Sequence, residues 1–242
     1  MQADPIWVRA LLSVHIAAGV TSFIMAPIAM ATAKGGRAHR RWGAVYFWAM
    51  AVVASTAVIL SLYRPILFLA LVAIFSFYAA FLAYRVLGQK GAVRQGETAV
   101  AAPAKPTGIT ALDWGAGGLT FVASLALFLC GWLRPAWIQH LPIPAMVFGF
   151  IGMRLAATEM WRFTHPPTEK MFWWFRHLQG MLASYIAAWT AFLVVALGRF
   201  IHAWWLWILP TAIGVPAIAM VTIYYQRKFS GRSRKRAAAV AT

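Results

Sequence analysis

Seven apolar stretches, each long enough to cross a bilayer as a helix, constrain this chain more than any other feature. A helix needs about 20 mostly apolar residues to span the hydrocarbon core. The stretches lack the alternation of a membrane β-strand, and lipid admits only helices or closed barrels. The sequence therefore predicts an all-α, polytopic membrane protein, a bundle of seven transmembrane helices. The predicted helices cover residues 6–33, 41–62, 64–87, 111–133, 143–162, 172–198 and 203–226.

Composition supports a membrane protein and argues against a nucleic-acid partner. Hydrophobic residues make up 62% of the 242 residues and charged residues 11%, whereas a soluble domain carries about 25% charged residues. The net charge is +17, but the basic residues lie between the apolar stretches. A nucleic-acid-binding protein would gather them on one face or in one domain. The lone cysteine, Cys130, excludes a disulfide within the chain and a C-x-x-C motif.

The basic residues also predict how the chain is oriented. Seventeen of the 22 Lys and Arg residues lie in alternate connections and in the C-terminal tail, all on one side of the predicted bundle. By the positive-inside rule, that side is cytoplasmic and the N-terminus is outside, in a bacterial cytoplasmic (inner) membrane. Residues 1–226 form a single domain, with a flexible cytoplasmic linker at 88–110. Residues 227–242 form a basic cytoplasmic tail that we expect to meet anionic lipid of the bilayer.

Three histidines, His15, His39 and His177, are each followed by a glycine three or four residues later. Such a glycine lies on the same helix face and removes bulk beside the imidazole. One interpretation is close helix packing, and the other is a cavity that admits a flat ligand. We expect His39 and His177 to enter from the same side of the membrane. We expect His15 to lie ~8–16 Å from the level of His177, so the two share only a large ligand.

The fifth predicted helix carries ionisable residues in an apolar setting. Glu159 and Arg162 are spaced to form an i,i+3 pair, whereas Arg154 and Glu159 face different sides. Arg154 lies deep enough to need a partner, either a carbonyl of a neighbouring helix or the anionic group of a ligand. Arg40, Arg154 and Glu159 are therefore the candidate ligand anchors.

The sequence resembles a bacterial family of predicted multi-helix membrane proteins of unknown function. The likeness lies in HIAAGVTSFIMAPIAMATAKGGRAHRRWGAVYFWAM of the first two helices and in RHLQGMLASYIAAWTA of the sixth. The resemblance implies a multi-helix membrane fold and no activity. One departure is Ala26-Pro27, where the family more often has Gly-Pro. The positions that match the family pattern are His15, Pro27, Lys34, His39, Arg40, Gly43, Tyr46 and His177.

The leading hypothesis is a histidine-lined cavity for b-type haem, with His15, His39 and His177 as candidate ligands and no other metal site. Histidines supply axial ligands, and Arg154 or Arg40 could meet the propionates. One alternative is a carrier or receptor for a small anionic or lipidic molecule, anchored by Arg154 and His177. Another is a non-catalytic membrane interaction protein. The sequence contains no motif of a hydrolase or a nucleotide-binding enzyme, so whether the protein is an enzyme stays open.

Overall fold

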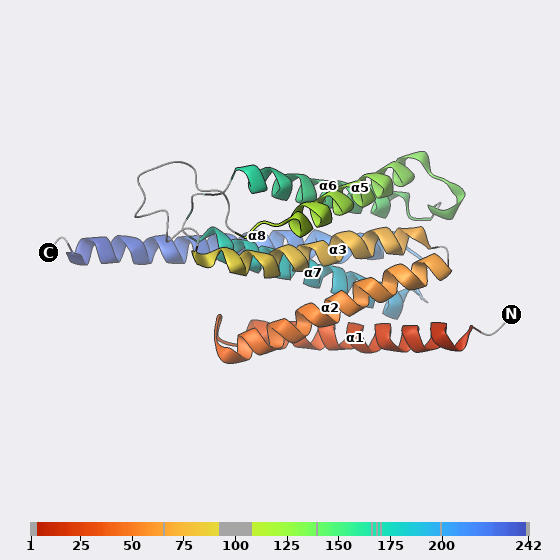
Figure 1. The fold of residues 1–242 in the computed structure, drawn as a ribbon, viewed down its shortest axis with the longest axis horizontal. Coiled ribbons are helices and arrows are strands. Elements are labelled where there is room, and N and C mark those ends of the chain that lie inside the picture. Colours follow the sequence, from red (N-terminus) through yellow and green to blue (C-terminus); the bar gives the residue numbers. More distant parts are fainter. Residues whose placement is uncertain are drawn as a thin grey trace.

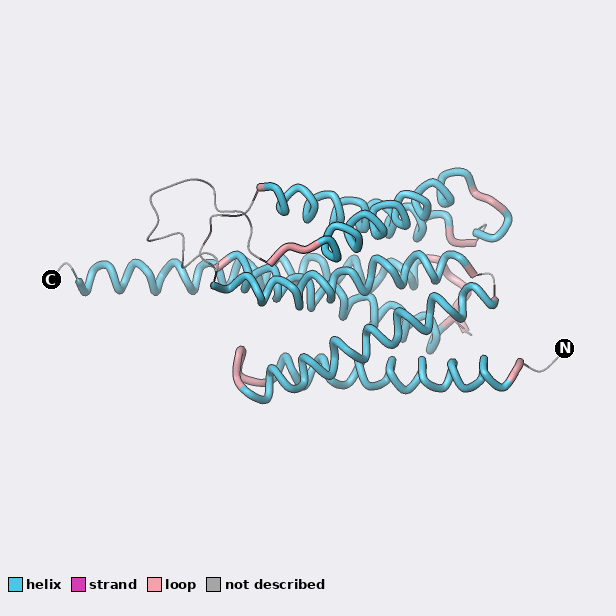
Figure 2. Tube along the Cα trace, in the orientation of Figure 1, coloured by secondary structure: helices cyan, strands magenta, loops and turns pink. Residues whose placement is uncertain are grey.

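The computed structural model describes residues 4–64, 66–91, 108–138, 140–165, 167, 169, 171–198 and 200–240. Within these residues it is a bundle of helices joined by short loops, with no strand (Figure 2). The α-helices are α1 (Ile6–Ala31), α2 (Arg37–Tyr63), α3 (Leu67–Arg85), α5 (Ala111–Leu133), α6 (Pro142–Thr164), α7 (Phe172–Leu197) and α8 (Trp205–Val240). Two short 3₁₀ helices are η1 (Val86–Gly91) and η2 (Ala136–Ile138).

All seven α-helices contain a segment long and apolar enough to cross a membrane, which confirms the predicted seven-helix, all-α fold. The surface of the bundle is apolar as well, because many large side chains face outward rather than into the core. Soluble proteins rarely expose so large an apolar surface to water, whereas the lipid of a bilayer is itself apolar and can surround it. The chain is therefore a multi-pass membrane protein. Outward-facing examples are Trp48, Leu119, Val122, Phe150 and Val195.

Two helix boundaries differ from the prediction by four residues or more. Helix α2 begins at Arg37 rather than near residue 41, so His39 belongs to its first turn and not to a loop. Helix α8 runs to Val240, beyond the predicted end at 226, because the basic and alanine-rich sequence there contains good helix formers and no proline. The segment expected as a separate tail thus continues α8 past the other helices (Figure 1). Of the predicted linker, residues 92–107 lie outside the described part.

The helices pack as antiparallel hairpins around α3 (Figure 1). The α1–α2 hairpin lies along one side of the bundle and the α5–α6 hairpin along the other, while α7 and α8 pack on each other. Helix α3 contacts α2, α5 and α7 and therefore lies at the centre. Because the hairpins alternate in direction, α1 begins and α8 ends at opposite ends of the bundle.

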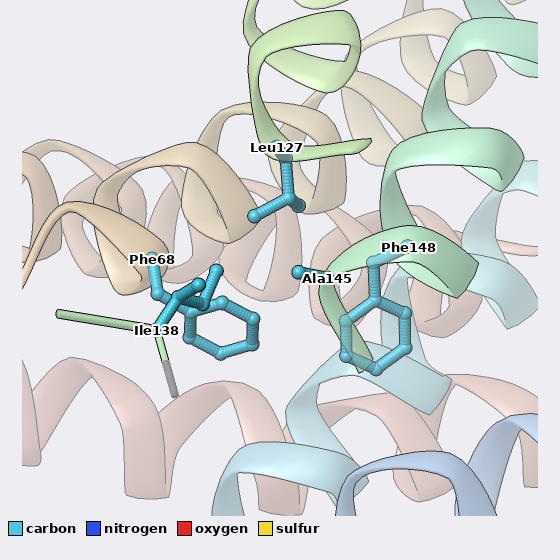
Figure 3. Close-up of a cluster of buried hydrophobic side chains, with 5 residues drawn as sticks. All are labelled: Phe68, Leu127, Ile138, Ala145 and Phe148. Carbon is cyan, nitrogen blue, oxygen red and sulfur yellow. The ribbon is translucent and has the colours of Figure 1, made fainter. Parts of the chain in front are cut away.

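A buried apolar cluster holds α3 against the α5–α6 hairpin (Figure 3). Its residues are Phe68, Leu127, Ile138, Ala145 and Phe148, all at most 4% exposed. Glycines allow the two helices of the hairpin to approach closely, since a Cβ on Gly149 would lie 2.6 Å from the Phe128 nitrogen. This cluster lies near the start of α3, and the polar groups described next lie near its end. We call the end of the bundle that holds the α1–α2 and α6–α7 connections the basic end.

Candidate functional site

His39 lies in the first turn of α2, at the basic end. Its Nδ1 atom is 2.9 Å from the carbonyl oxygen of Ala29, near the end of α1. The tight turn between α1 and α2 brings the two residues together, and Gly35 in that turn has φ 77°, a left-handed conformation that suits glycine. The imidazole therefore ties the beginning of one helix to the end of its neighbour.

His177 lies in the second turn of α7 and makes the matching contact to α3. Its Nδ1 atom is 2.9 Å from the carbonyl oxygen of Ala83. Gly180, one turn further along α7, explains this close approach: a Cβ at that position would lie 2.7 Å from the Ala83 Cβ and 2.8 Å from the Ala79 oxygen. The glycine beside His177 thus serves helix packing. By contrast, a Cβ on Gly43 or Gly19 would meet nothing within 4 Å.

The two imidazoles form a pair between α2 and α7. Their ring centroids are 6.1 Å apart and their planes make an angle of 78°. A carbonyl oxygen can only accept a hydrogen bond, so each Nδ1 carries the hydrogen. In the neutral ring this leaves the lone pair on Nε2, the nitrogen through which such a histidine can ligate a metal. Metal-binding histidines commonly donate their other N–H to a carbonyl in this way.

His15 does not belong to this pair. Its Nδ1 atom is 2.8 Å from Oγ1 of Thr56, in the half of the α1–α2 hairpin away from the basic end. Thr56 lies about 25 Å further along α2 than His39, by the rise of a helix. The expected separation of ~8–16 Å from the level of His177 is therefore too small. The antiparallel packing of α1 on α2 is the reason, since it places His15 towards the start of α1 and far from the basic end.

A second contact between α2 and α7 lies two turns deeper than the histidine pair. Oη of Tyr46 is 2.6 Å from Oγ of Ser184, and both residues are buried. Tyr46 follows His39 by seven residues and Ser184 follows His177 by seven, so each pair occupies one helix face. The matching spacing on two helices is a signal that sequence reasoning had missed. The two contacts show that α2 and α7 run in the same direction where their side chains meet.

The structure separates the predicted anchors. Arg40 is exposed, and its Nη1 donates to the carbonyl oxygen of Gly35 at 3.1 Å. Arg154 is exposed on α6. Among the described residues, none forms a hydrogen bond or ion pair with its side chain. Glu159 is buried and accepts from Nη1 of Arg162 at 2.7 Å, which confirms the predicted i,i+3 pair. Arg154 and Glu159 lie on different sides of α6, as predicted.

Arg176 is the residue of this region that sequence reasoning missed. It lies next to His177 on α7, and its Nη2 donates to the same Glu159 oxygen, Oε1, that accepts from Arg162. The sequence marked Arg176 only as one of many basic residues near a membrane boundary. Nothing in the local pattern pairs it with a carboxylate on another helix, because that contact depends on how α6 packs beside α7.

A cavity of about 240 Å³ opens beside this ion pair. Residues of α3, α6, α7 and α8 line it, and its polar groups are Glu159, Arg176 and Gln179. The Gln179 side chain is oriented by a hydrogen bond from its Nε2 to Oγ1 of Thr222 at 3.3 Å. Neither His177 nor Arg154 is among the lining residues. The histidine pair and the cavity are therefore two separate features of the basic end.

A second ion pair links the end of α3 to the beginning of α5. Arg85 donates to both oxygens of Asp113, at 2.8 and 2.6 Å. Asp113 also accepts from the backbone N–H of Thr110 at 2.8 Å and so caps the beginning of α5. The buried hydroxyl of Tyr78 lies within range of electrostatic interaction with Asp113 and Arg176 and has no hydrogen-bond partner in the described residues.

Comparison with known proteins assigns this chain to no family. No family model, no curated protein and no solved structure matches the chain.

Proposed function

We propose that His39 and His177 hold a b-type haem and that the protein transfers electrons in the membrane. The observation that carries this proposal is the histidine pair itself. Its two rings come from different helices, their centroids are 6.1 Å apart, and each Nδ1 donates to a main-chain carbonyl. Each ring is therefore held in one orientation by its carbonyl partner.

The number of ligands favours haem over a bare metal ion. A structural zinc site takes four protein ligands and a catalytic one takes three. The described residues contain no group of three or more His, Cys, Asp or Glu side chains that could hold a metal. Haem needs at most two protein ligands, because the porphyrin supplies four nitrogens. Two histidines thus supply the number of protein ligands that a haem can take.

The spacing of the rings fits the same ligand. Ring centroids 6.1 Å apart bring the two imidazoles close enough to hold one bound group. A Cβ at Gly43, beside His39, would meet no atom within 4 Å, whereas a Cβ at Gly180, beside His177, would clash with Ala83. Bound haem would supply one-electron chemistry at its iron.

The residues of the chain would position the ligands rather than react. The carbonyls of Ala29 and Ala83 hold the two rings, and the Tyr46–Ser184 hydrogen bond holds α2 against α7 two turns below them. These contacts would hold the two rings in place for one bound group. His15, tied to Thr56, takes no part.

The proposed setting is the bacterial cytoplasmic membrane, with the basic end in the cytoplasm. The basic residues that gather at this end support that orientation through the positive-inside rule. The resemblance of the first, second and sixth helices to a bacterial membrane family supports the same setting. On this orientation the histidine pair lies near the cytoplasmic surface, and the helical extension of α8 carries basic residues that would meet anionic lipid headgroups.

The test is the absorption spectrum of the full-length protein, purified in mild detergent from haem-replete cells, before and after reduction with dithionite. We expect a Soret band and sharp α and β bands at about one haem per chain. His39→Ala and His177→Ala should lose the bound haem. His15→Ala and His165→Ala are the matched controls and should keep it, since His165 is an exposed histidine at the same end. A colourless protein would overturn the proposal.

The second candidate function is a carrier or receptor for a small anionic or lipidic molecule, with its site at a different place from the predicted one. The observation that favours it is the cavity beside Arg176, rather than a pocket anchored by Arg154 and His177. The interaction-protein hypothesis predicts that all three histidines can be replaced without loss of function, so the same variants test it.

A further inference from the structure

We infer that the cavity between α3, α6, α7 and α8 binds the anionic headgroup of a membrane amphiphile, with Arg176 as its anchor. This site is independent of the histidine pair and of haem. The ligand class is an oxyanion, a phosphate or a carboxylate, attached to an apolar chain. The inference rests on the donors that converge on the cavity, on its apolar walls and on its size.

The donors of the arginines outnumber the acceptor atoms nearby. Arg162 and Arg176 each carry five N–H donors. Each of them donates a hydrogen bond to the same oxygen of Glu159, Oε1. Arg162 has a further carboxylate neighbour in the exposed Glu169, whereas Arg176 has none besides Glu159 within the described residues. The Arg176 side chain is only 21% exposed, so few of its remaining donors reach bulk water. An oxyanion in the cavity would supply the missing acceptors.

The position of Arg176 strengthens this argument. It lies in the second turn of α7, near the positive end of the helix dipole, where a cation is disfavoured and an anion is favoured. Glu159 supplies one negative charge there. A bound phosphate or carboxylate would add a second one opposite the guanidinium.

The rest of the cavity is apolar. Its walls include Leu82 of α3, Leu155 of α6, Ala183 of α7 and Ile218 of α8. A free inorganic anion would gain nothing from such walls, whereas the first methylenes of an acyl or alkyl chain would be buried against them. The site therefore has a charged end and an apolar end, as an amphiphile does.

The volume limits how much of the ligand enters. About 240 Å³ is less than the ~300–1,000 Å³ of typical small-molecule sites. The cavity thus holds a headgroup and the beginning of a chain, and the remaining chain would continue along the apolar outer surface among the lipids. A molecule embedded in the bilayer meets this requirement better than a soluble metabolite.

Native mass spectrometry of the full-length protein in mild detergent tests the inference, with dodecyl phosphate as the probe. We expect saturable binding of one molecule per chain. Dodecyltrimethylammonium, which has the same chain and a cationic head, should not compete. Inorganic phosphate should compete at least tenfold more weakly. Equal competition by inorganic phosphate would show a site for a free anion and overturn the amphiphile.

Three variants locate the binding. Arg176→Gln should weaken it by roughly 10- to 100-fold, the loss of a charge-assisted hydrogen bond. Ala183→Phe keeps every charge but fills the cavity from an exposed position and should weaken binding similarly. Arg154→Gln removes the same charge from α6 outside the cavity and should bind as the parent does. Circular dichroism and gel filtration establish that each variant is folded. Unchanged binding by a folded Ala183→Phe protein would overturn the assignment to this cavity.

Discussion

The hydroxyl of Tyr46 lies 2.6 Å from the hydroxyl of Ser184, two helical turns from the histidine pair on the same two helices. Helices α1 and α2 otherwise form a hairpin along one side of the bundle (Figure 1). This buried hydrogen bond and the His39–His177 contact are therefore two of the points where α7 holds α2 in place.

Replacing Tyr46 with Phe tests the first of these contacts. Ser184 keeps its hydrogen bond to the Met181 carbonyl, so no buried group loses every partner. We expect a loss of about 0.5–1.5 kcal/mol in the free energy of unfolding, measured by denaturant titration in detergent. Tyr84→Phe is the control, because the Tyr84 side chain is exposed and stacks on Phe47 without a hydrogen bond in the described residues. Equal losses in the two variants would contradict this role for Tyr46.

The glycine beside His177 should tolerate no side chain. In Gly180→Ala the new Cβ would lie 2.7 Å from the Ala83 Cβ, so α7 must move away from α3 and stretch the hydrogen bond from His177. We expect destabilisation by about 1–3 kcal/mol, as for other overpacked sites, together with a lower haem content. The matched change Gly19→Ala meets open space and should be neutral or stabilising by up to about 1 kcal/mol. Thermal unfolding of both variants, followed by circular dichroism, measures the difference.

Glu159 should be more important for stability than any other carboxylate of the α6–α7 region. Glu159→Gln removes the shared acceptor of two arginines in a buried setting, and we expect a loss of about 1.5–3 kcal/mol. Glu169→Gln changes an exposed carboxylate in the connection that follows α6, and should cost less than about 0.5 kcal/mol. The two unfolding midpoints, compared in one detergent, check the order. A larger effect at Glu169 would refute the ion-pair assignment.

The proposed orientation can be measured with C-terminal reporter fusions in a bacterial host. A fused green fluorescent protein should fluoresce and a fused alkaline phosphatase should be inactive, because the proposed orientation places the basic end of the bundle in the cytoplasm. Replacing Lys34, Arg37, Arg40 and Arg41 with Gln removes the charges between α1 and α2 and should lower this asymmetry. An active phosphatase fusion on the parent chain would reverse the orientation and place the histidine pair near the outer surface.

Several features of the site could be predicted from residue spacing, and others could not. The i,i+3 spacing of Glu159 and Arg162 correctly predicted an ion pair, because both ends lie on one helix. The second partner of that carboxylate, Arg176, lies on α7 and was missed. The sequence also nominated Arg154 as an anchor, since it lies in the middle of an apolar helix. The side chain instead faces outward, because α6 turns its other faces to the helices packed on it.

The sequence alone determined that this chain forms seven membrane-spanning helices. Lipid requires each segment to satisfy its own backbone hydrogen bonds, so length and hydropathy suffice to locate the spans. Only the tertiary structure decided which polar residues meet. His39 faces His177 rather than His15, and Arg176 reaches Glu159, because α7 packs beside both the α1–α2 hairpin and α3. Neighbour relations between helices depend on side-chain packing along whole helix faces, such as the fit of Gly180 against Ala83, which no local pattern encodes.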